Sequence, residues 1–141
     1  MEGGGWIASA VELVKFVSVF DNPSKCPLLN AASIEQMWAR PNGALGLDAD
    51  GKPKSRFYAC GWGVGVVGNT GKVEASHAGM VAGAESLIIR RSDGLCWAVL
   101  FNMPRQTDSE YQFELIIPRL NEVVAKIKAW PNYDLFSALL T

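Results

Sequence analysis

The order of apolar and polar residues divides the chain into helical ends and a strand-rich middle. Between residues 57 and 103, short apolar runs alternate with turn sequences. Glycine alternates with large apolar residues in 60–67, a hairpin-type turn follows at 68–71, and β-prone runs occupy 86–89 and 96–101. This pattern predicts an antiparallel sheet meander of about four strands.

Residues on the N-terminal side of this region follow helical spacing. Ser9 and Glu12 are spaced as a capping box, and the periodicity after them predicts a helix from about residue 9 to 20, which Asn22-Pro23 ends. Ser33 is predicted to cap a short second helix that ends before Pro41. The apolar face of the first helix consists of Val11, Leu13, Val14, Phe16, Val17 and Phe20.

A C-terminal helix is predicted around Pro118. Proline fits the first position of a helix, and apolar residues then recur at helical spacing. The alternative is one longer helix that is kinked at Pro118. The predicted inward-facing residues are Leu120, Val123, Val124 and Ile127. The fold class is therefore predicted to be α+β, with the sheet packed against N- and C-terminal helices in a single domain that spans residues 1–141.

Composition limits the classes of partner. The chain has 141 residues, of which 49% are hydrophobic and 19% charged, and its net charge is -1. This balance argues against binding to nucleic acid or to an anionic membrane surface. No apolar run approaches the roughly 20 residues of a membrane helix, and the N-terminus lacks the basic start of a secretory signal. We expect a soluble, cytoplasmic protein, although a mature secreted chain would have the same features.

No metal or cofactor is expected from the residues that usually bind one. Cys26, Cys60 and Cys96 lie far apart, and no second thiol or histidine lies near them at zinc-ligand spacing, so we expect buried free thiols. The acidic segment 48–51 lacks the later glutamate of a calcium loop and is predicted to be a solvated turn.

The glycine-rich strand contains a phosphate-loop look-alike, Gly63-Val-Gly65-Val-Val-Gly68. A dinucleotide site requires this turn to open a helix, whereas here a turn and a second strand are predicted to follow. We therefore reject a nucleotide site. The alternating glycines are expected to leave one face of the strand bare, so that another group can lie close to it.

His77, the only histidine, lies in the tripeptide His77-Ala78-Gly79, with Gly83 four residues after Gly79. On a strand, His77 and Gly79 share one face, which places a histidine beside a side-chain vacancy that suits a binding edge. The alternative is a half-buried histidine that a neighbouring carbonyl satisfies. Both interpretations remain open at this point.

Five segments together resemble the C-terminal part of the serine β-lactamase-related hydrolases, which include penicillin-binding, D-aminopeptidase-like and esterase-like members. The resemblance covers nearly the whole chain in the right order. His77-Ala78-Gly79 is similar to the third active-site motif of that family, which is Lys-Thr-Gly in the lactamases and often His-x-Gly in the esterase-like members. The segments are 4–16, 61–63, 77–83, 100–102 and 130–136.

The resemblance implies a partial β-lactamase/transpeptidase-like fold and a role for four residues. In this family the strand with the triplet forms one wall of the substrate cleft, and the residue after its glycine, here Met80, gives a backbone N–H to the oxyanion hole. His77 would hydrogen-bond the substrate or help to hold the surroundings of the nucleophile. His77, Ala78, Gly79 and Met80 are thus the candidate substrate-binding and oxyanion residues for an ester or amide.

The catalytic groups of the family are missing from this chain. No serine is followed three residues later by lysine, and Tyr58, Tyr111 and Tyr133 do not begin a Tyr-x-Asn motif. A serine needs an adjacent base to attack an acyl group, so no complete catalytic site is expected and the chain alone should be inactive.

Three hypotheses follow for such a truncated hydrolase or pseudoenzyme. In the first, the N-terminal half of a parent hydrolase completes the site. In the second, the chain is a non-catalytic binding or interaction module that uses the same cleft wall and forms oligomers through the open strand edge at 95–102 or through the exposed face of the first helix. In the third, the triplet is ordinary sheet sequence and the role is structural.

Overall fold

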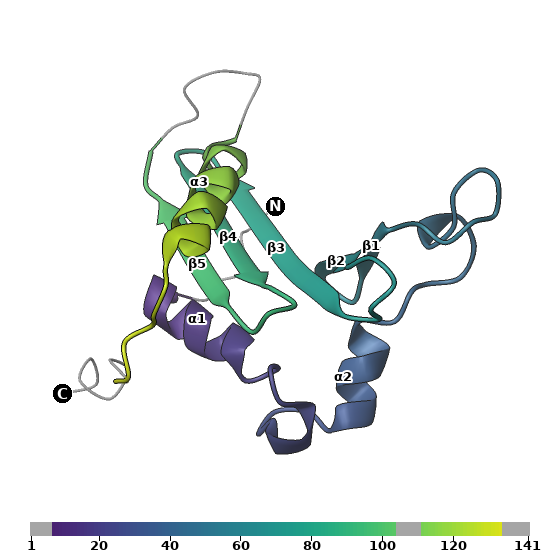
Figure 1. Cartoon of the computed structure of the whole chain (residues 1–141). Coiled ribbons are helices and arrows are strands. Elements are labelled where there is room, and N and C mark those ends of the chain that lie inside the picture. Colours follow the sequence, from purple (N-terminus) through teal and green to yellow (C-terminus); the bar gives the residue numbers. More distant parts are fainter. Residues whose placement is uncertain (1–6, 104–110, 134–141) are drawn as a thin grey trace.

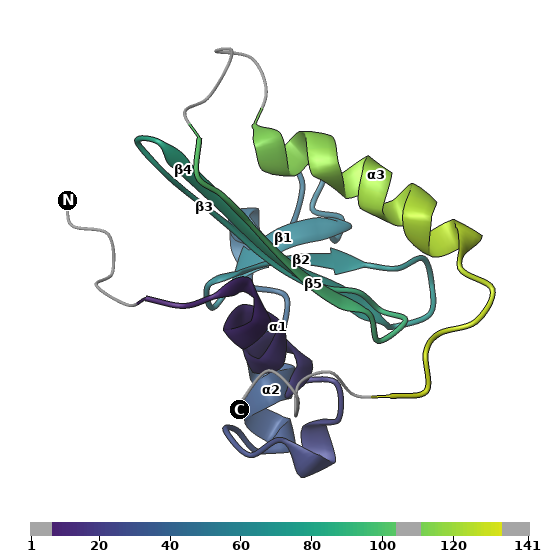
Figure 2. The same ribbon diagram turned by 90° about the vertical axis from the view of Figure 1, so that its left-hand side faces the viewer.

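The computed structural model describes residues 7–103 and 111–133, which form an α+β fold. A five-stranded antiparallel sheet lies between helices (Figure 2). Helices α1 (Ala10–Ser18) and α2 (Ala31–Met37) lie on one side of the sheet and α3 (Gln112–Lys126) lies on the other. Two short 3-10 helices, η1 (Pro23–Lys25) and η2 (Gly43–Leu45), lie in the loops before and after α2. The predicted α+β class, with an antiparallel sheet and helices, is confirmed.

The sheet is a simple meander in which every strand pairs with its neighbours in the sequence (Figure 1). It contains five strands, whereas about four were expected. The additional strand is β1, which is only four residues long and therefore too short to show a clear alternation of polar and apolar residues. The strands are β1 (Arg56–Ala59), β2 (Trp62–Val66), β3 (Val73–Val81), β4 (Ala84–Arg90) and β5 (Cys96–Phe101).

The hydrophobic core lies between the sheet and the two N-terminal helices. Val17 of α1, Ile34 of α2 and Val64 of β2 are almost completely buried. On the opposite face, the structure shows no fully buried residue in α3. The sheet is therefore packed tightly on one side and more loosely on the other. The core cluster consists of Val17, Phe20, Ile34, Phe57, Ala59, Trp62, Val64 and Ala75.

The starts of the two N-terminal helices test the capping predictions. The capping box of α1 is confirmed, because the Glu12 amide donates to Ser9 Oγ and the Ser9 amide donates to Glu12 Oε2 at 2.7 Å. The Ser9 amide and the Ser9 hydroxyl both donate to the Glu12 carboxylate, and these two hydrogen bonds lower the pKa of Glu12. The predicted cap of α2 is wrong. Asn30 caps this helix by accepting from the Ser33 amide at 2.9 Å, so Ser33 lies inside the first turn.

Helix α3 starts six residues before Pro118, so the longer helix is the correct alternative. Its start is held by Glu85 of β4, a side chain with only 4% exposure. Glu85 Oε2 accepts from the amides of Gln112 at 2.6 Å and Phe113 at 3.4 Å. These are N–H groups that the first turn of a helix leaves without intrahelical partners. A carboxylate from the sheet thus fixes the helix start.

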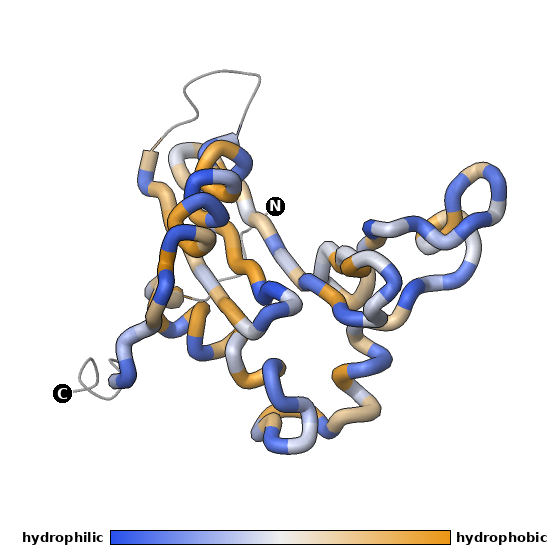
Figure 3. Tube along the Cα trace, in the orientation of Figure 1, coloured by the Kyte–Doolittle hydropathy of each residue, from blue (hydrophilic) through white to orange (hydrophobic). Residues whose placement is uncertain are grey.

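Two predicted apolar positions are more exposed than expected. Val123 on α3 is 57% exposed and Phe16 on α1 is 44% exposed, whereas the adjacent Val124 is partly buried and the adjacent Val17 is fully buried. In Figure 3, apolar stretches follow α1, α3 and the strands between them. Within the described ranges, no helix combines the length and the apolar character that crossing a membrane requires.

Candidate functional site

In the described part of the chain, the C-terminal half of β3 has one edge without a partner strand, called here the unpaired edge. Strand β2 pairs only with Val73–Ser76, because its register ends at Gly63 opposite Ser76. On its other side, β3 pairs with β4 as far as Val81. Figure 1 shows this part of β3 extending past the β1–β2 hairpin. From His77 to Val81, one edge of the strand therefore has no neighbouring strand among the residues that the structure describes.

The register determines which backbone groups point to this edge. Val81 lies opposite Ala84 across a two-residue turn, so these two residues exchange their N–H and C=O groups. In an antiparallel ladder such hydrogen-bonded pairs alternate with pairs whose backbone groups point outward. Gly79 consequently bonds to β4. The N–H and C=O groups of Ala78 and Met80 point away from β4, toward the unpaired edge.

His77 lies at the start of the unpaired edge, and its side chain is exposed. Its Nδ1 lies 2.6 Å from the carbonyl oxygen of Gly61 and 3.5 Å from Tyr58 Oη. A carbonyl can only accept, so Nδ1 carries the hydrogen and donates to Gly61. In the neutral ring Nε2 is then an acceptor, for which the described residues provide no partner. The carbonyl contact matches one of the two interpretations, but the ring is exposed rather than half-buried.

Gly61 belongs to the tight turn that brings its carbonyl to His77. Cys60 and Gly61 connect β1 and β2 with φ angles of +46° and +85°. Two successive positive φ angles are typical of the type I′ turn, which matches the twist of a two-stranded hairpin. Cys60 is the single non-glycine residue with positive φ in the described ranges. The hairpin thus positions the carbonyl that fixes the tautomer of the imidazole.

Gly79 has a packing role that the sequence did not reveal. A Cβ atom at this position would lie 2.7 Å from Ser86 Oγ, which is closer than real contacts allow. Ser86 lies directly opposite Gly79 on β4, and its hydroxyl donates to the Gly79 carbonyl at 3.5 Å. The absence of a side chain at position 79 therefore lets the serine lie against the strand.

Replacing Gly79 with alanine should lower the free energy of unfolding by up to about 1 kcal/mol, because Ser86 must leave the rotamer in which its hydroxyl donates to the Gly79 carbonyl, and this cost outweighs the entropy gained on leaving glycine. The variant with both Gly79→Ala and Ser86→Ala should recover most of this loss, since the clashing hydroxyl is gone. Urea denaturation of the wild type, both single variants and the double variant gives the coupling energy. Additive losses in the double variant would contradict the packing role.

A pocket of about 440 Å³ lies at the end of this edge, around the β3–β4 turn. Met80 and Val81, which line it, are 54% and 61% exposed. Gly83 forms the turn with φ +82°. The unpaired backbone groups thus end beside an apolar surface. The remaining lining residues are Ala82, Ala84, Glu85 and Met103.

The four candidate residues lie consecutively on β3, as the sequence predicted. The His77 side chain and the side-chain position left empty at Gly79 lie on one face of the sheet, and the side chains of Ala78 and Met80 lie on the other, because a strand alternates. Sequence reasoning missed Tyr58 and Gly61, which reach His77 only through the β1–β2 hairpin. The Cys60-Gly61 dipeptide was the available signal for that turn.

The cysteines and acidic residues fit structural roles. All three thiols are free, but Cys60 is exposed and the other two are partly buried, so the expectation of buried thiols is wrong for Cys60. Burial, with the nearby Asp21 carboxylate, raises the pKa of Cys96 to about 12. Asp48 Oδ1 accepts from the amides of Asp50 and Lys52, which makes the acidic segment an ordinary turn. The described residues contain no cluster of three metal-ligand side chains.

The glycine motif also has the structure expected of it. Gly63 and Gly65 lie in β2, and the chain turns at Gly68 into β3 rather than into a helix. A dinucleotide site at this motif is therefore excluded by its context.

Comparisons of the chain with protein-family models, with curated proteins and with solved structures find no match.

Proposed function

We propose that this chain is the C-terminal half of a serine hydrolase related to the β-lactamases and penicillin-binding proteins, and that it supplies one wall of an acyl-transfer site. The observation that carries this proposal is the unpaired edge of β3. There, the backbone groups of Ala78 and Met80 point outward beside the exposed imidazole of His77. An extended ester or amide ligand can pair with such an edge through main-chain hydrogen bonds.

Each residue at this edge has a chemical role in the proposal. A serine of the other half attacks the acyl carbon and gives its proton to a base of that half, and negative charge develops on the carbonyl oxygen. The Met80 N–H donates to this oxygen, which lowers the barrier because the donor is already oriented. Nε2 of His77 accepts a hydrogen bond from the ligand or from the nucleophile, while Gly61 holds Nδ1.

The other half is required because this chain lacks both of the family's catalytic motifs. No Ser-x-x-Lys and no Tyr-x-Asn occurs in the sequence. The chain alone therefore has a binding edge and an oxyanion donor but no activated nucleophile. A second chain, or a preceding part of a longer protein, would have to present these groups to β3.

An activated ester tests the proposal directly. With p-nitrophenyl acetate, the chain alone should release no burst of nitrophenol, because no serine is activated. Addition of an N-terminal half that carries Ser-x-x-Lys and Tyr-x-Asn, taken from a related hydrolase or encoded upstream, should produce turnover. Turnover by the chain alone at a rate typical of enzymes would contradict the proposal, and so would a complex that assembles but stays inactive.

A second candidate is a non-catalytic module that associates through β5. This strand is the last in the sheet order, so its outer edge has no partner strand in the described part of the chain, and its Leu100 is 44% exposed. An unpaired apolar edge favours pairing with another chain. Light scattering of the same samples distinguishes the two. A dimer of the chain alone supports the module, and a monomer at high concentration counts against it.

A further inference from the structure

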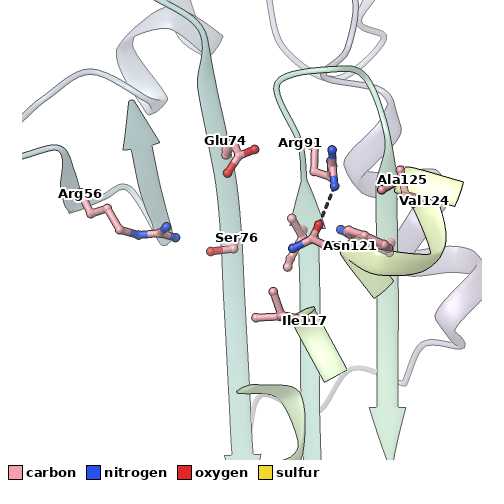
Figure 4. A pocket seen from close by; sticks show the side chains of 10 residues that line it. Arg56, Glu74, Ser76, Arg91, Ile117, Asn121, Val124 and Ala125 are labelled. Atoms are coloured by element: carbon pink, nitrogen blue, oxygen red, sulfur yellow. Dashed lines mark hydrogen bonds between the residues drawn. The ribbon is translucent and has the colours of Figure 1, made fainter. Parts of the chain in front are cut away.

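A second pocket, called here the α3 pocket, lies between the sheet and helix α3, apart from the unpaired edge of β3. It has a volume of about 500 Å³, and Figure 4 shows the side chains that line it. Five of them are polar and come from four parts of the chain. They are Arg56 of β1, Glu74 and Ser76 of β3, Arg91 just after β4, and Asn121 of α3.

Gly65 of β2 leaves room for the Arg56 side chain of the pocket. The strand register places Arg56, Gly65 and Glu74 in one row across three strands, on the face that α3 covers. Because Gly65 has no side chain, the Arg56 side chain lies across it, with its guanidinium carbon 3.6 Å from the place that a Cβ would occupy. The bare face expected from the alternating glycines is thus the face that contains the α3 pocket.

The charges that line the α3 pocket are unevenly paired. Arg91 forms an ion pair with Asp93 at 2.7 Å, and this contact raises the pKa of Arg91. Arg56 and Glu74 carry opposite charges in the same row, yet no ion pair joins them to each other or to another described residue. Among the described residues, the pocket therefore presents one cation and one anion that form no ion pair, although the Glu74 carboxylate acts on Arg91 at longer range and helps to raise its pKa.

Asn121 adds an oriented donor. Arg91 Nη1 donates to Asn121 Oδ1 at 2.5 Å, the contact drawn as a dashed line in Figure 4. Because a guanidinium can only donate, the amide oxygen must face Arg91, which leaves the amide nitrogen as a donor. Apolar side chains complete the lining, with Trp97, Ile117 and Val124 among them. This combination of a few polar groups and apolar walls is typical of small-molecule sites.

We propose that the α3 pocket binds an apolar α-amino acid as its zwitterion. The Arg56 guanidinium receives the carboxylate, which it matches in geometry, and the Glu74 carboxylate receives the ammonium group. The side chain of the amino acid lies against Ile117, Val124 and Trp97. A simple anion would leave Glu74 without a close ion pair and a simple cation would leave Arg56 without one, so the zwitterion is the ligand that gives both charges a direct partner.

Calorimetric titration of the full chain with L-leucine tests this proposal. N-acetyl-leucine lacks the ammonium group and leucinamide lacks the carboxylate, and each should bind roughly tenfold more weakly or worse, because each loses a charge-assisted hydrogen bond. Comparable affinity for all three compounds would overturn the zwitterion. No saturable binding of leucine with a Kd below about 10 mM would overturn the site.

Two charge-removing variants test which charged group of leucine each pocket side chain binds. Arg56→Gln and Glu74→Gln should each weaken leucine binding roughly tenfold, and Glu74→Gln should leave the weak binding of N-acetyl-leucine unchanged or improve it. Arg119→Gln is the matched control. This arginine lies on α3, but its side chain is 75% exposed and does not line the pocket. An equal loss in the control would contradict the assignment.

Amide chemical shifts in the wild-type protein provide a measurement that needs no variant. Leucine should shift the signals of Val124 and Ala125, which line the pocket, more than those of Ala78 and Met80 at the unpaired edge. The opposite pattern would overturn the location. Because leucine binding requires no nucleophile and no second half, these results do not depend on whether acyl transfer is observed.

Discussion

Replacing Phe20 with alanine should lower the free energy of unfolding by about 3–5 kcal/mol, the range found when a buried aromatic ring is removed. Phe20 is only 3% exposed and connects three parts of the core. Its ring makes edge-on contacts with the rings of Phe16, Trp38 and Trp62. The distances between ring centroids are 5.4 Å, 6.1 Å and 6.3 Å, respectively. These contacts link α1, the end of α2 and β2, so the loss affects how both N-terminal helices pack on the sheet.

Urea denaturation followed by circular dichroism measures this loss. Phe16→Ala is the matched control, because the same ring is removed one turn earlier on α1 from a position that is 44% exposed. It should cost about 1 kcal/mol or less, since most of the transfer energy depends on burial. Equal losses in the two variants would show that the core does not lie between α1 and the sheet. For a typical domain stability of about 5–15 kcal/mol, Phe20→Ala removes a large share.

Local features of the fold could be predicted from the sequence, whereas features set by distant residues could not. The capping box at Ser9 and Glu12 was predicted correctly because both partners lie three residues apart. For α2, Asn30 and Ser33 were both suitable caps, and the choice depended on where the preceding loop ends. The sequence left open whether α3 starts near Gln112 or at Pro118, because the partner that fixes its start, Glu85, lies on β4 and is 27 residues away from Gln112.

The candidate site shows the same difference between local features, which the sequence predicts, and features set by distant residues, which it does not. Alternation on one strand was sufficient to place His77 and Gly79 on one face and Met80 on the other. The contact of His77 with Gly61 depends on the register between β2 and β3, which the sequence does not specify. The row of Arg56, Gly65 and Glu74 in the α3 pocket depends on two successive registers. Of the features of this pocket, only the bare face that the glycines leave on β2 could be predicted from the sequence.

The largest functional effect is expected from Met80→Pro in the complex with an N-terminal half. Proline has no N–H, so the variant removes the proposed oxyanion donor and leaves the other backbone atoms in place. Loss of one such donor typically reduces turnover roughly 10²- to 10³-fold. The fold should tolerate the proline, because the N–H of Met80 points to an unpaired edge and takes part in no ladder hydrogen bond. Gly79 before it is already extended, as a residue before proline requires.

Met80→Ala is the matched control, since it removes the 54% exposed side chain but keeps the N–H. Its turnover of p-nitrophenyl acetate should stay within about threefold of the wild type, because the proposed interaction uses the backbone alone. The free energy of unfolding of each variant, from urea denaturation, should change by less than about 1 kcal/mol. A proline variant with normal turnover would contradict the oxyanion role of Met80, and one that unfolds would contradict the unpaired edge of β3 on which that role depends.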